Sequence, residues 1–517
     1  MTVHVKVSAA HKMLVVPPHA GVAAMFGGRP VLPDGNILVP HGFAETLMLR
    51  HLGFQIPSPL MYYDWAGGTP YAVQRKTVEM LTEHPRAYVL NHMGTGKTKT
   101  ALWAWDVLRR EGLAKKMLVV APLSTLNFVW AREVFRTLTG CRVQVLHGSR
   151  QERLDKLATD ADIYIINHDG IKVIYNELWT RADVDTLVLD ELAVYRNNSD
   201  RSKRMRKFAS RFKIVWGMTG APMPNEPTDV WSQCKIITPH TVPQFRSHAR
   251  TMLMEPMAYS PWVWRPKKDA VDRAFSWMQP SCRYALDDVV ELPPIISRQI
   301  DVPLSAEQAR VYKRVATAMQ AMVKDKQITA LNAGAAMNKL LQIAGGWVYT
   351  QKPDFVRLDP SPRIVAMADV IRSAERKVLV AIPYRHMIEG ISKILRMKGV
   401  EIEHAVVHGD TPNREQIFNL FQNTDKFNVM LVHPQCVAHG VTLTAADTIL
   451  WYLPITSLDI YDQFNARIRR IGQMHKQQIL HLQGTPIERK TYRMLREHQK
   501  MQEQFLKLVE DATGETP

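Results

Sequence analysis

Cysteine is scarce in this sequence, and the few cysteines lie far apart. The 517 residues include four, and none belongs to a C-x-x-C pair: Cys141, Cys234, Cys282 and Cys436. Disulfide frameworks and zinc ribbons need several cysteines at close, regular spacing. We therefore expect reduced, buried thiols and no zinc site.

Long apolar runs are also missing. No stretch approaches the ~18 apolar residues that a membrane helix requires. Lys6, His11 and Lys12 interrupt the N-terminus, where a signal peptide would have its apolar core. We expect a cytoplasmic protein with no membrane partner. Since 46% of the residues are hydrophobic, the chain has enough apolar material for two or three cored domains.

Acidic residues are outnumbered by basic ones. The sequence has 66 lysines and arginines against 49 aspartates and glutamates, which gives a net charge of +17. Such an excess indicates a polyanionic partner. Nucleic acid is the leading candidate, because neutralisation of backbone phosphates supplies most of the non-specific affinity. Charge alone does not distinguish DNA from RNA.

The most informative stretch, residues 87–98, combines a short apolar run, a turn with two glycines and the start of a helix. The apolar run predicts a buried strand over Tyr88–Leu90, and a helical pattern continues over Thr100–Arg110. This order of strand, glycine turn and helix is typical of a phosphate-binding loop.

Each residue type in this loop suits a nucleotide triphosphate. Gly94 and Gly96 let backbone N–H groups turn toward phosphate oxygens, and the helix N-terminus adds its dipole. Lys97 supplies a positive charge, and the Thr98 hydroxyl can ligate Mg²⁺. The strict loop pattern has glycine where this chain has Asn91, so the loop departs from it there.

Residues Thr186–Leu192 predict a second part of the same site. A short apolar strand ends in two adjacent carboxylates, Asp190 and Glu191. Asp190 can hold Mg²⁺ through its water shell, while Glu191 can orient and deprotonate an attacking water. A solvated acidic pair is the alternative interpretation. We favour the catalytic one because a phosphate-binding loop lies upstream.

Taken together, the motifs resemble those of the Swi/Snf-like ATPases, a branch of helicase superfamily 2. The form Met93-Gly-Thr-Gly-Lys-Thr98 is similar to their motif I, and Tyr461–Gln473 resembles their motif VI pattern Q-A-x-x-R-x-x-R-x-G-Q. Met117–Trp130 resembles motif Ia, and Val215–Asn225 resembles motif III. The resemblance covers about residues 67–495, in the family's order of motifs.

The resemblance implies ATP and Mg²⁺ as the bound groups and assigns residues to them. The residues expected to contact ATP come from motif I, from motif VI and from a position where the family reads adenine: Met93, Gly94, Thr95, Gly96, Lys97 and Thr98, then Gln463, then Gln74. The metal would be held by Thr98 and Asp190. Without the neighbouring motifs, Gln74 would be interpreted as a surface glutamine on a helix.

Two arginines of motif VI complete the catalytic set with Lys97 and Glu191. The spacing puts Arg467 and Arg470 three residues apart, which predicts that both lie on one face of a helix and point at one γ-phosphate. The resemblance implies that they act as arginine fingers when two lobes close. The alternative is a basic surface helix.

The resemblance also implies residues that couple hydrolysis to nucleic acid. Ser124 of motif Ia is expected to bond a backbone phosphate, and Thr219 and Gly220 belong to motif III. Gly440 lies in the region of motif V. Four tryptophans in the following segment either contact DNA or pack in a core, and we favour packing: Trp231, Trp262, Trp264 and Trp277.

We predict an α/β fold with two RecA-like parallel-sheet lobes in tandem, helical insertions and a small N-terminal accessory module. The predicted boundaries are 1–66 for the module, 67–291 for lobe 1 with a helical insertion over about 226–291, and 292–517 for lobe 2 with a helical segment over about 305–345 and a terminal helix from about 487. Within the module, Arg29–Pro40 predicts a hairpin and Phe43–Leu52 a helix.

The resemblance implies an ATPase that moves along DNA, and translocation on double-stranded DNA is our leading hypothesis. A strand-separating or fork-remodelling helicase and a nucleotide-gated DNA-binding or loading factor are the alternatives.

The chain resembles compact members that bacteriophages also encode, which would place it in the host cytoplasm, and we favour a monomer. It departs from the family at Asn91-His92, where an acidic pair is common, and at Ala438 and Thr442, where glycine and asparagine are common.

Overall fold

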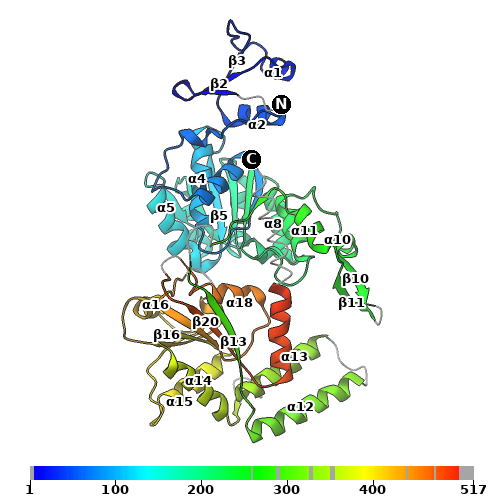
Figure 1. Ribbon diagram of the computed structural model, residues 1–517, viewed down its shortest axis with the longest axis vertical. Helices are drawn as coiled ribbons and strands as arrows, with labels where there is room; N and C mark the ends of the chain where they lie inside the picture. The colour runs from blue at the N-terminus through cyan, green and yellow to red at the C-terminus, as the bar shows by residue number, and fades with distance from the viewer. Residues whose placement is uncertain are drawn as a thin grey trace.

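Three units follow one another along the chain, each with a sheet of its own (Figure 1). The structure is a computed structural model that describes residues 5–257, 260–286, 292–324, 330–349, 355–437, 441–470 and 473–499. In Figure 1 a small N-terminal unit lies at the top, and two larger units with parallel sheets lie below it. We call the middle unit lobe 1 and the lower unit lobe 2. This arrangement confirms the predicted α/β fold with two parallel-sheet lobes.

The N-terminal unit is a three-stranded antiparallel sheet with two short helices. Its elements are β1 (Lys6–Ser8), β2 (Met13–Val16), α1 (Ala20–Met25), β3 (Ile37–Pro40) and α2 (Phe43–His51). Leu14, Val39 and Phe54 belong to a core cluster that is separate from the cores of the two lobes. The unit therefore has its own apolar interior.

The hairpin predicted for this unit forms only in part. The turn is present, since Leu32 N donates to Asn36 O at 2.8 Å, but its two arms meet in a single bridge between Val31 and Ile37. Strand β3 pairs along its length with β2 instead. Pro30 and Pro33 carry no N–H, so the first arm cannot supply a regular ladder.

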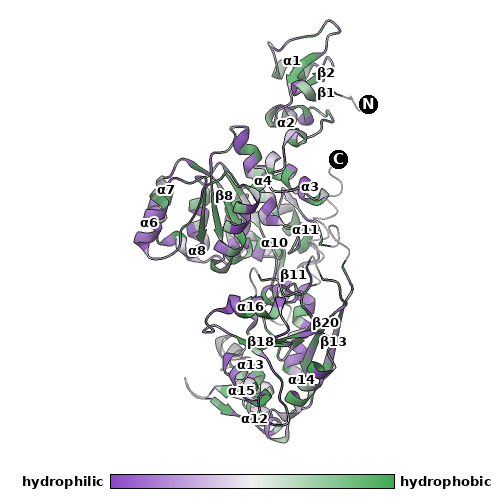
Figure 2. Cartoon of the chain, turned by 90° about the vertical axis from the view of Figure 1, so that its left-hand side faces the viewer, coloured by the Kyte–Doolittle hydropathy of each residue, from purple (hydrophilic) through white to green (hydrophobic). Residues whose placement is uncertain are grey.

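Lobe 1 is built on a sheet of seven strands in which every pairing is parallel. In spatial order the strands are β12 (Ser281–Cys282), β4 (Arg86–Val89), β9 (Ile214–Met218), β8 (Val184–Asp190), β5 (Lys116–Ala121), β7 (Ile163–Asn167) and β6 (Val143–Val145). Parallel sheets are covered on both faces, which explains why the central strands are almost wholly apolar. Figure 2 shows this contrast between the hydrophobic strand β8 and the hydrophilic outer helix α6 (Arg150–Ala158).

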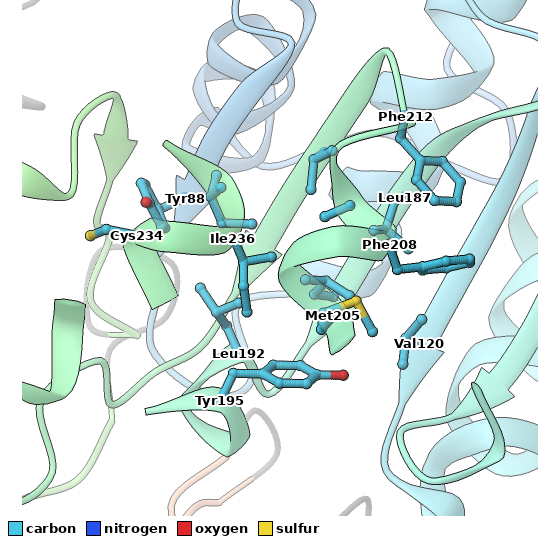
Figure 3. Packing of buried hydrophobic residues seen from close by; sticks show 14 of the residues in the cluster. Tyr88, Val120, Leu187, Leu192, Tyr195, Met205, Phe208, Phe212, Cys234 and Ile236 are labelled. Atoms are coloured by element: carbon cyan, nitrogen blue, oxygen red, sulfur yellow. The ribbon is translucent and has the colours of Figure 1, made fainter. Parts of the chain in front are cut away.

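Alternate residues of the strands enter two different cores. Tyr88 of β4 packs in one cluster and Val89 in the other, as the period of two in a strand requires. Helix α8 (Asp200–Ala209) contributes Met205 and Phe208 to the first cluster, near Val120 of β5 (Figure 3). The second cluster receives residues of α4 (Lys97–Arg110). The remaining helices of the sheet region are α3 (Ala72–Glu83), α5 (Arg132–Thr137) and α7 (Tyr175–Thr180).

The segment predicted as a helical insertion is mixed rather than helical. It contains α9 (Asp229–Ile237), α10 (Arg246–Leu253), a hairpin of β10 (Met254–Met257) with β11 (Ser260–Pro266), α11 (Ala270–Trp277) and finally β12. Strand β12 adds parallel to β4 and so belongs to the sheet of lobe 1. Alternating Trp-x-Trp sequence with β-branched Val263 favours the hairpin over a helix.

The tryptophans of this segment pack mostly inside the protein. Trp231 is 2% exposed and donates from Nε1 to Pro243 O at 2.8 Å, and Trp277 lies in the same core. Trp264 is half-buried beneath the guanidinium of Arg250, which lies 4.2 Å from its ring centroid. The side chain of Trp262 lies outside the described residues. Core packing is thus the role of Trp231 and Trp277, and Trp264 packs against the same core from its edge.

Lobe 2 has six strands, again paired in parallel throughout. Their order is β13 (Ile295–Asp301), β20 (Gln477–Gln483), β19 (Ala446–Trp451), β16 (Lys377–Ala381), β18 (Val429–Val432) and β17 (Ala405–Val407). Its helices are α12 (Ala306–Lys324), α13 (Ala330–Gly345), α14 (Ser361–Ser373), α15 (Arg385–Leu395), α16 (Arg414–Asn423), α17 (Pro434–Val437), α18 (Leu458–Asn465) and a further helix over 486–499. A hairpin of β14 (Trp347–Tyr349) and β15 (Phe355–Arg357) follows α13.

The structure bears on the cysteines and on membrane-spanning helices. The four cysteines are all free thiols, three of them buried and Cys436 half-buried. Within the part of the chain that the structure describes, no helix combines the length and the apolar character needed to cross a bilayer.

A buried ion pair fastens the final helix to lobe 2 and can be tested. Arg363 and Glu488 meet at 2.7 Å with side chains 3% and 0% exposed, and Glu488 Oε2 also accepts the N–H groups of Gly484 and Thr485. Glu488→Ala would leave the buried guanidinium of Arg363 without its carboxylate. We therefore expect this substitution to lower the free energy of unfolding of lobe 2 by about 3–5 kcal/mol. Urea unfolding followed by circular dichroism measures this loss.

The neighbouring Arg489 provides a matched control. It pairs with Asp301 on the surface, with side chains 46% and 65% exposed, so Arg489→Ala should cost at most about 1 kcal/mol. Equal unfolding midpoints for the two variants would contradict this account of lobe 2.

Candidate active site

The phosphate-binding loop joins β4 to α4 and depends on its two glycines. Gly94 and Gly96 have φ angles of +89° and +86°, in the left-handed region that favours glycine. A Cβ at Gly96 would lie 2.5 Å from Nε2 of Gln74. No other residue fits there without displacing that amide, so the loop's shape is fixed by these positions.

Lys97 begins α4 and folds back over the loop. Its Nζ donates to Asn91 O at 2.8 Å and to His92 O at 3.3 Å. Burial lowers the pKa of Lys97, while the nearby carboxylates of Glu191 and Asp190 favour its charged form. Phosphate oxygens are the ligand that a half-buried ammonium at the N-terminus of a helix would attract. Thr98, the next residue, is half-buried.

Asn91 accounts for the departure from the strict loop pattern. Its Nδ2 donates to Thr77 Oγ1 at 3.0 Å, and its Oδ1 accepts the N–H of Tyr284 at 3.0 Å. The N–H of His92 donates in turn to Tyr284 O at 3.0 Å. An ionised carboxylate could accept but not donate, so an amide at this position joins the loop both to α3 and to the chain after β12.

Gln74 lies against the loop, but both ends of its amide are engaged within the protein. Nε2 donates to Thr95 O at 3.0 Å, and Oε1 accepts the N–H of Tyr71 at 3.0 Å. The side chain is 6% exposed. Gln74 thus braces the loop, and because each end of an amide can make a second hydrogen bond, its contact with adenine stays a prediction.

The acidic pair lies at the carboxyl end of β8. Asp190 Oδ2 accepts the indole N–H of Trp130 at 2.8 Å, and its Oδ1 accepts the N–H of Glu191 at 3.1 Å. Glu191 has a φ angle of +52°, an unusual conformation for a residue with a side chain and one that concentrates at functional sites.

Both residues of the pair are half-buried, and their partial removal from water changes their acidity. Burial raises the pKa of Asp190. Burial also raises the pKa of Glu191, and the negative charges of Asp190 and then of Asp459 raise it further. Carboxylate and hydroxyl oxygens are the ligands that a hard divalent cation prefers. Asp190 and Thr98 are therefore of the right chemical type to hold Mg²⁺, and this role stays a prediction.

The residues predicted for coupling occupy different places. Thr219 and Gly220 lie against the loop: Thr219 N donates to Val89 O at 3.1 Å, and a Cβ at Gly220 would lie 3.7 Å from Asn91 O and 3.9 Å from Lys97 Nζ. Ser124 is exposed in the turn after β5. Gly440 lies outside the described residues.

The motif VI arginines do not share a helix face, contrary to the prediction. Helix α18 ends at Asn465, and Arg467 and Arg470 lie in the turns that follow it. The carbonyl of Arg467 accepts the N–H of Leu443 at 3.1 Å instead of continuing a helix. A spacing of three residues suits a helix and a turn equally well, so the sequence could not separate them.

Arg467 nevertheless reaches from lobe 2 to the loop of lobe 1. It is 3% exposed, and its Nη2 lies 3.9 Å from Sδ of Met93. Its Nε and Nη1 donate to Gln463 O at 2.9 Å and to Val441 O at 3.2 Å. Burial strongly lowers the pKa of Arg467, and the charge of Arg470 lowers it further.

The second arginine and the glutamine of motif VI flank Arg467. Arg470 Nη1 donates to Thr442 Oγ1 at 2.9 Å, so Thr442, at a position where the family commonly has asparagine, supports it. Gln463 is 1% exposed and donates from Nε2 to Asp459 Oδ1 at 2.8 Å. Its Oε1 finds no hydrogen-bond partner among the residues described.

Sequence reasoning missed three residues of this region. Trp130 donates to Asp190, and Arg283 donates from Nη1 to Leu90 O at 2.7 Å beside the loop. The charge of Asp459, in the other lobe, raises the pKa of Glu191. Trp130 was inside a recognised motif, but nothing in the sequence gave its partner. Arg283 follows β12, a strand too short to stand out in the sequence.

Two family models match the chain. The SNF2-related domain matches residues 74–346, and the helicase conserved C-terminal domain matches residues 363–472. The first of these ranges contains the loop and the acidic pair, and the second contains both motif VI arginines.

Individual proteins are similar at lower identity. A protein called p41 from Acyrthosiphon pisum secondary endosymbiont phage 1 is 26% identical over 80% of this chain and 90% of its own length. A SWI/SNF-related regulator of chromatin, subfamily A-like protein 1, from Xenopus laevis is 23% identical over 83% of this chain, which spans only 42% of that protein. The solved SWI2/SNF2 ATPase core of Sulfolobus solfataricus in complex with dsDNA is 18% identical, covers 90% of this chain and 97% of its own, and has a TM-score of 0.40.

The bridging role of Asn91 leads to a test of stability. Asn91→Ala removes a 2% exposed amide that bonds both Thr77 and the N–H of Tyr284, so we expect the free energy of unfolding of lobe 1 to fall by about 1–3 kcal/mol. A double-mutant cycle with Thr77→Val should assign about 1 kcal/mol to the bond between the two side chains. Asn127→Ala, at an exposed position of the same lobe, should leave the unfolding midpoint unchanged. An Asn91→Ala protein as stable as the parent would refute the bridge.

Proposed function

The chain belongs to the SNF2-related family, whose domain model covers more than half of its residues, and we propose that it is an ATP-driven translocase that moves along double-stranded DNA. Membership makes it a nucleic-acid-dependent ATPase. That its nucleic acid is double-stranded DNA, and that it moves along this DNA, are the two parts of the proposal.

The observation that carries the proposal is the contact between lobes at the nucleotide loop. Arg467 of lobe 2 approaches Met93 of lobe 1 at 3.9 Å, and Asp459 of lobe 2 is near enough to influence Glu191. A site divided in this way is complete only when the lobes are together. Binding and hydrolysis of ATP can therefore drive the lobes together and apart, which is the motion a translocase requires.

The residues of the site support hydrolysis of a γ-phosphate. Lys97 and the loop N–H groups would bind the phosphates, and Glu191 would orient a water and accept its proton. The water oxygen forms a bond to the γ-phosphorus while the bond from phosphorus to the bridging oxygen breaks, leaving ADP and phosphate. Arg467 and Arg470 would stabilise the charge on the transferred group. Thr98 and Asp190 would hold Mg²⁺, which neutralises phosphate charge when bound.

The choice of duplex DNA rests on charge and on a relative. The chain carries a net charge of +17, which suits a phosphate backbone. The similar protein of Xenopus laevis is named as a regulator of chromatin, and DNA in chromatin is duplex. The similarity to a phage protein supports the host cytoplasm as the place of action.

Two substitutions test the chemical roles. Lys97→Ala should abolish nucleotide-dependent activity, because the phosphates lose their buried cation. Glu191→Gln should bind ATP normally and lose about 10²–10⁴ in turnover, because the amide cannot accept the proton. Phosphate release and fluorescent-nucleotide binding measure the two effects. Lys99→Ala, two residues along α4, is the matched control and should retain turnover. Substantial hydrolysis by Glu191→Gln would remove Glu191 from the role of base.

A panel of nucleic acids tests the track. ATP turnover should rise most with duplex DNA, compared with no nucleic acid, single-stranded DNA and RNA. The protein should also displace the third strand of a triplex in an ATP-dependent way without separating the duplex. Duplex unwinding would favour the strand-separating helicase, and stimulation without any displacement would favour the nucleotide-gated loading factor. Strong stimulation by RNA alone would overturn the proposed substrate.

A further inference from the structure

Trp130 contacts the acidic pair from a different motif. It is fully buried, and its indole Nε1 donates to Oδ2 of Asp190 at 2.8 Å. We propose that Trp130 is a positioning residue for the metal site: its hydrogen bond fixes the Asp190 carboxylate in the orientation in which it can hold Mg²⁺. The inference rests on the proposed function, in which Asp190 is an acid of the metal site.

The fold explains how a residue so distant in sequence reaches Asp190. Strands β5 and β8 are parallel neighbours, with Val120 opposite Leu189, so their carboxyl ends lie side by side. After β5 the chain forms a turn over Leu123–Thr125 and then a π-helical turn over Leu126–Ala131. From this π turn the Trp130 side chain reaches Asp190, the last residue of β8. Such turns are rare and concentrate at functional sites.

The bond from Trp130 orients Asp190 and leaves the carboxylate able to bind a metal ion. Indole N–H is a donor only, so Trp130 can hold the ionised carboxylate but cannot compete for a cation. The other oxygen, Oδ1, accepts the N–H of Glu191 at 3.1 Å, so both oxygens of Asp190 are oriented by the protein. Removal of a partner that orients a metal-binding carboxylate commonly costs 10–100-fold in metal affinity or activity.

The experiment removes the N–H while keeping the shape of the ring. β-(3-Benzothienyl)alanine at position 130 replaces the indole N–H with sulfur, and Trp130→Phe gives the same loss by ordinary mutagenesis. Trp105→Phe is the matched control, because Trp105 is equally buried in lobe 1 and its Nε1 has no hydrogen-bond partner among the described residues. Affinity for Mn²⁺, used as the probe metal, is measured by electron paramagnetic resonance on the protein with a non-hydrolysable ATP analogue.

We expect Mn²⁺ to bind about tenfold more weakly to both position-130 variants and with unchanged affinity to Trp105→Phe. Excess Mg²⁺ should restore most of the ATP turnover of the position-130 variants, which general damage to the core would not allow. Mn²⁺ affinity within twofold of the parent in the benzothienyl variant would overturn the inference. A parent protein that binds no Mn²⁺ with the analogue would instead refute the metal site itself, and the two failures are therefore distinct.

Discussion

Grouping of opposite charges where lobe 1 meets lobe 2 is the constraint on which this structure depends. Lys97, Asp190 and Glu191 come from lobe 1 and Arg467 comes from lobe 2, and burial shifts the pKa of each toward its neutral form. An isolated charge in such a place is costly, and one that loses its partner is more so. The cations and carboxylates therefore stabilise one another where the two lobes meet, and a bound anionic substrate with its metal would add further pairs of opposite charge.

Neutral side chains hold these charges in place. Asn91 joins the loop to α3 and to Tyr284, Gln74 braces Thr95, and Trp130 orients Asp190. Each uses a donor or acceptor that carries no charge, so none of them adds a further buried charge to the site. The substitution of Asn91 for an acidic residue, which looked like a defect in the motif, follows from this arrangement.

The fold class and the centre of the site could be predicted because their signals are local. A strand, a glycine turn and a helix lie within a few residues around Lys97, and the apolar strand before Asp190 ends at the carboxylates themselves. Prediction from the sequence failed where an element or a contact depends on a residue far away along the chain. The end of α18 before Arg467 depends on Leu443, the place of β12 depends on β4, and the partner of Trp130 lies on another strand. The metal and nucleotide roles of the grouped residues stay predictions.

The edge strands of the two sheets impose an order on assembly during synthesis. Strand β4, which leads into the nucleotide loop, gains its outer neighbour only when β12 has been made, after the whole intervening lobe. Strand β13 pairs with β20 alone, so residues 295–301 wait for residues 477–483. Pairings between such distant segments form slowly and leave strand edges exposed meanwhile. The sheet of lobe 2 therefore gains its strand β20, and with it the partner of β13, only after residue 483 has been made.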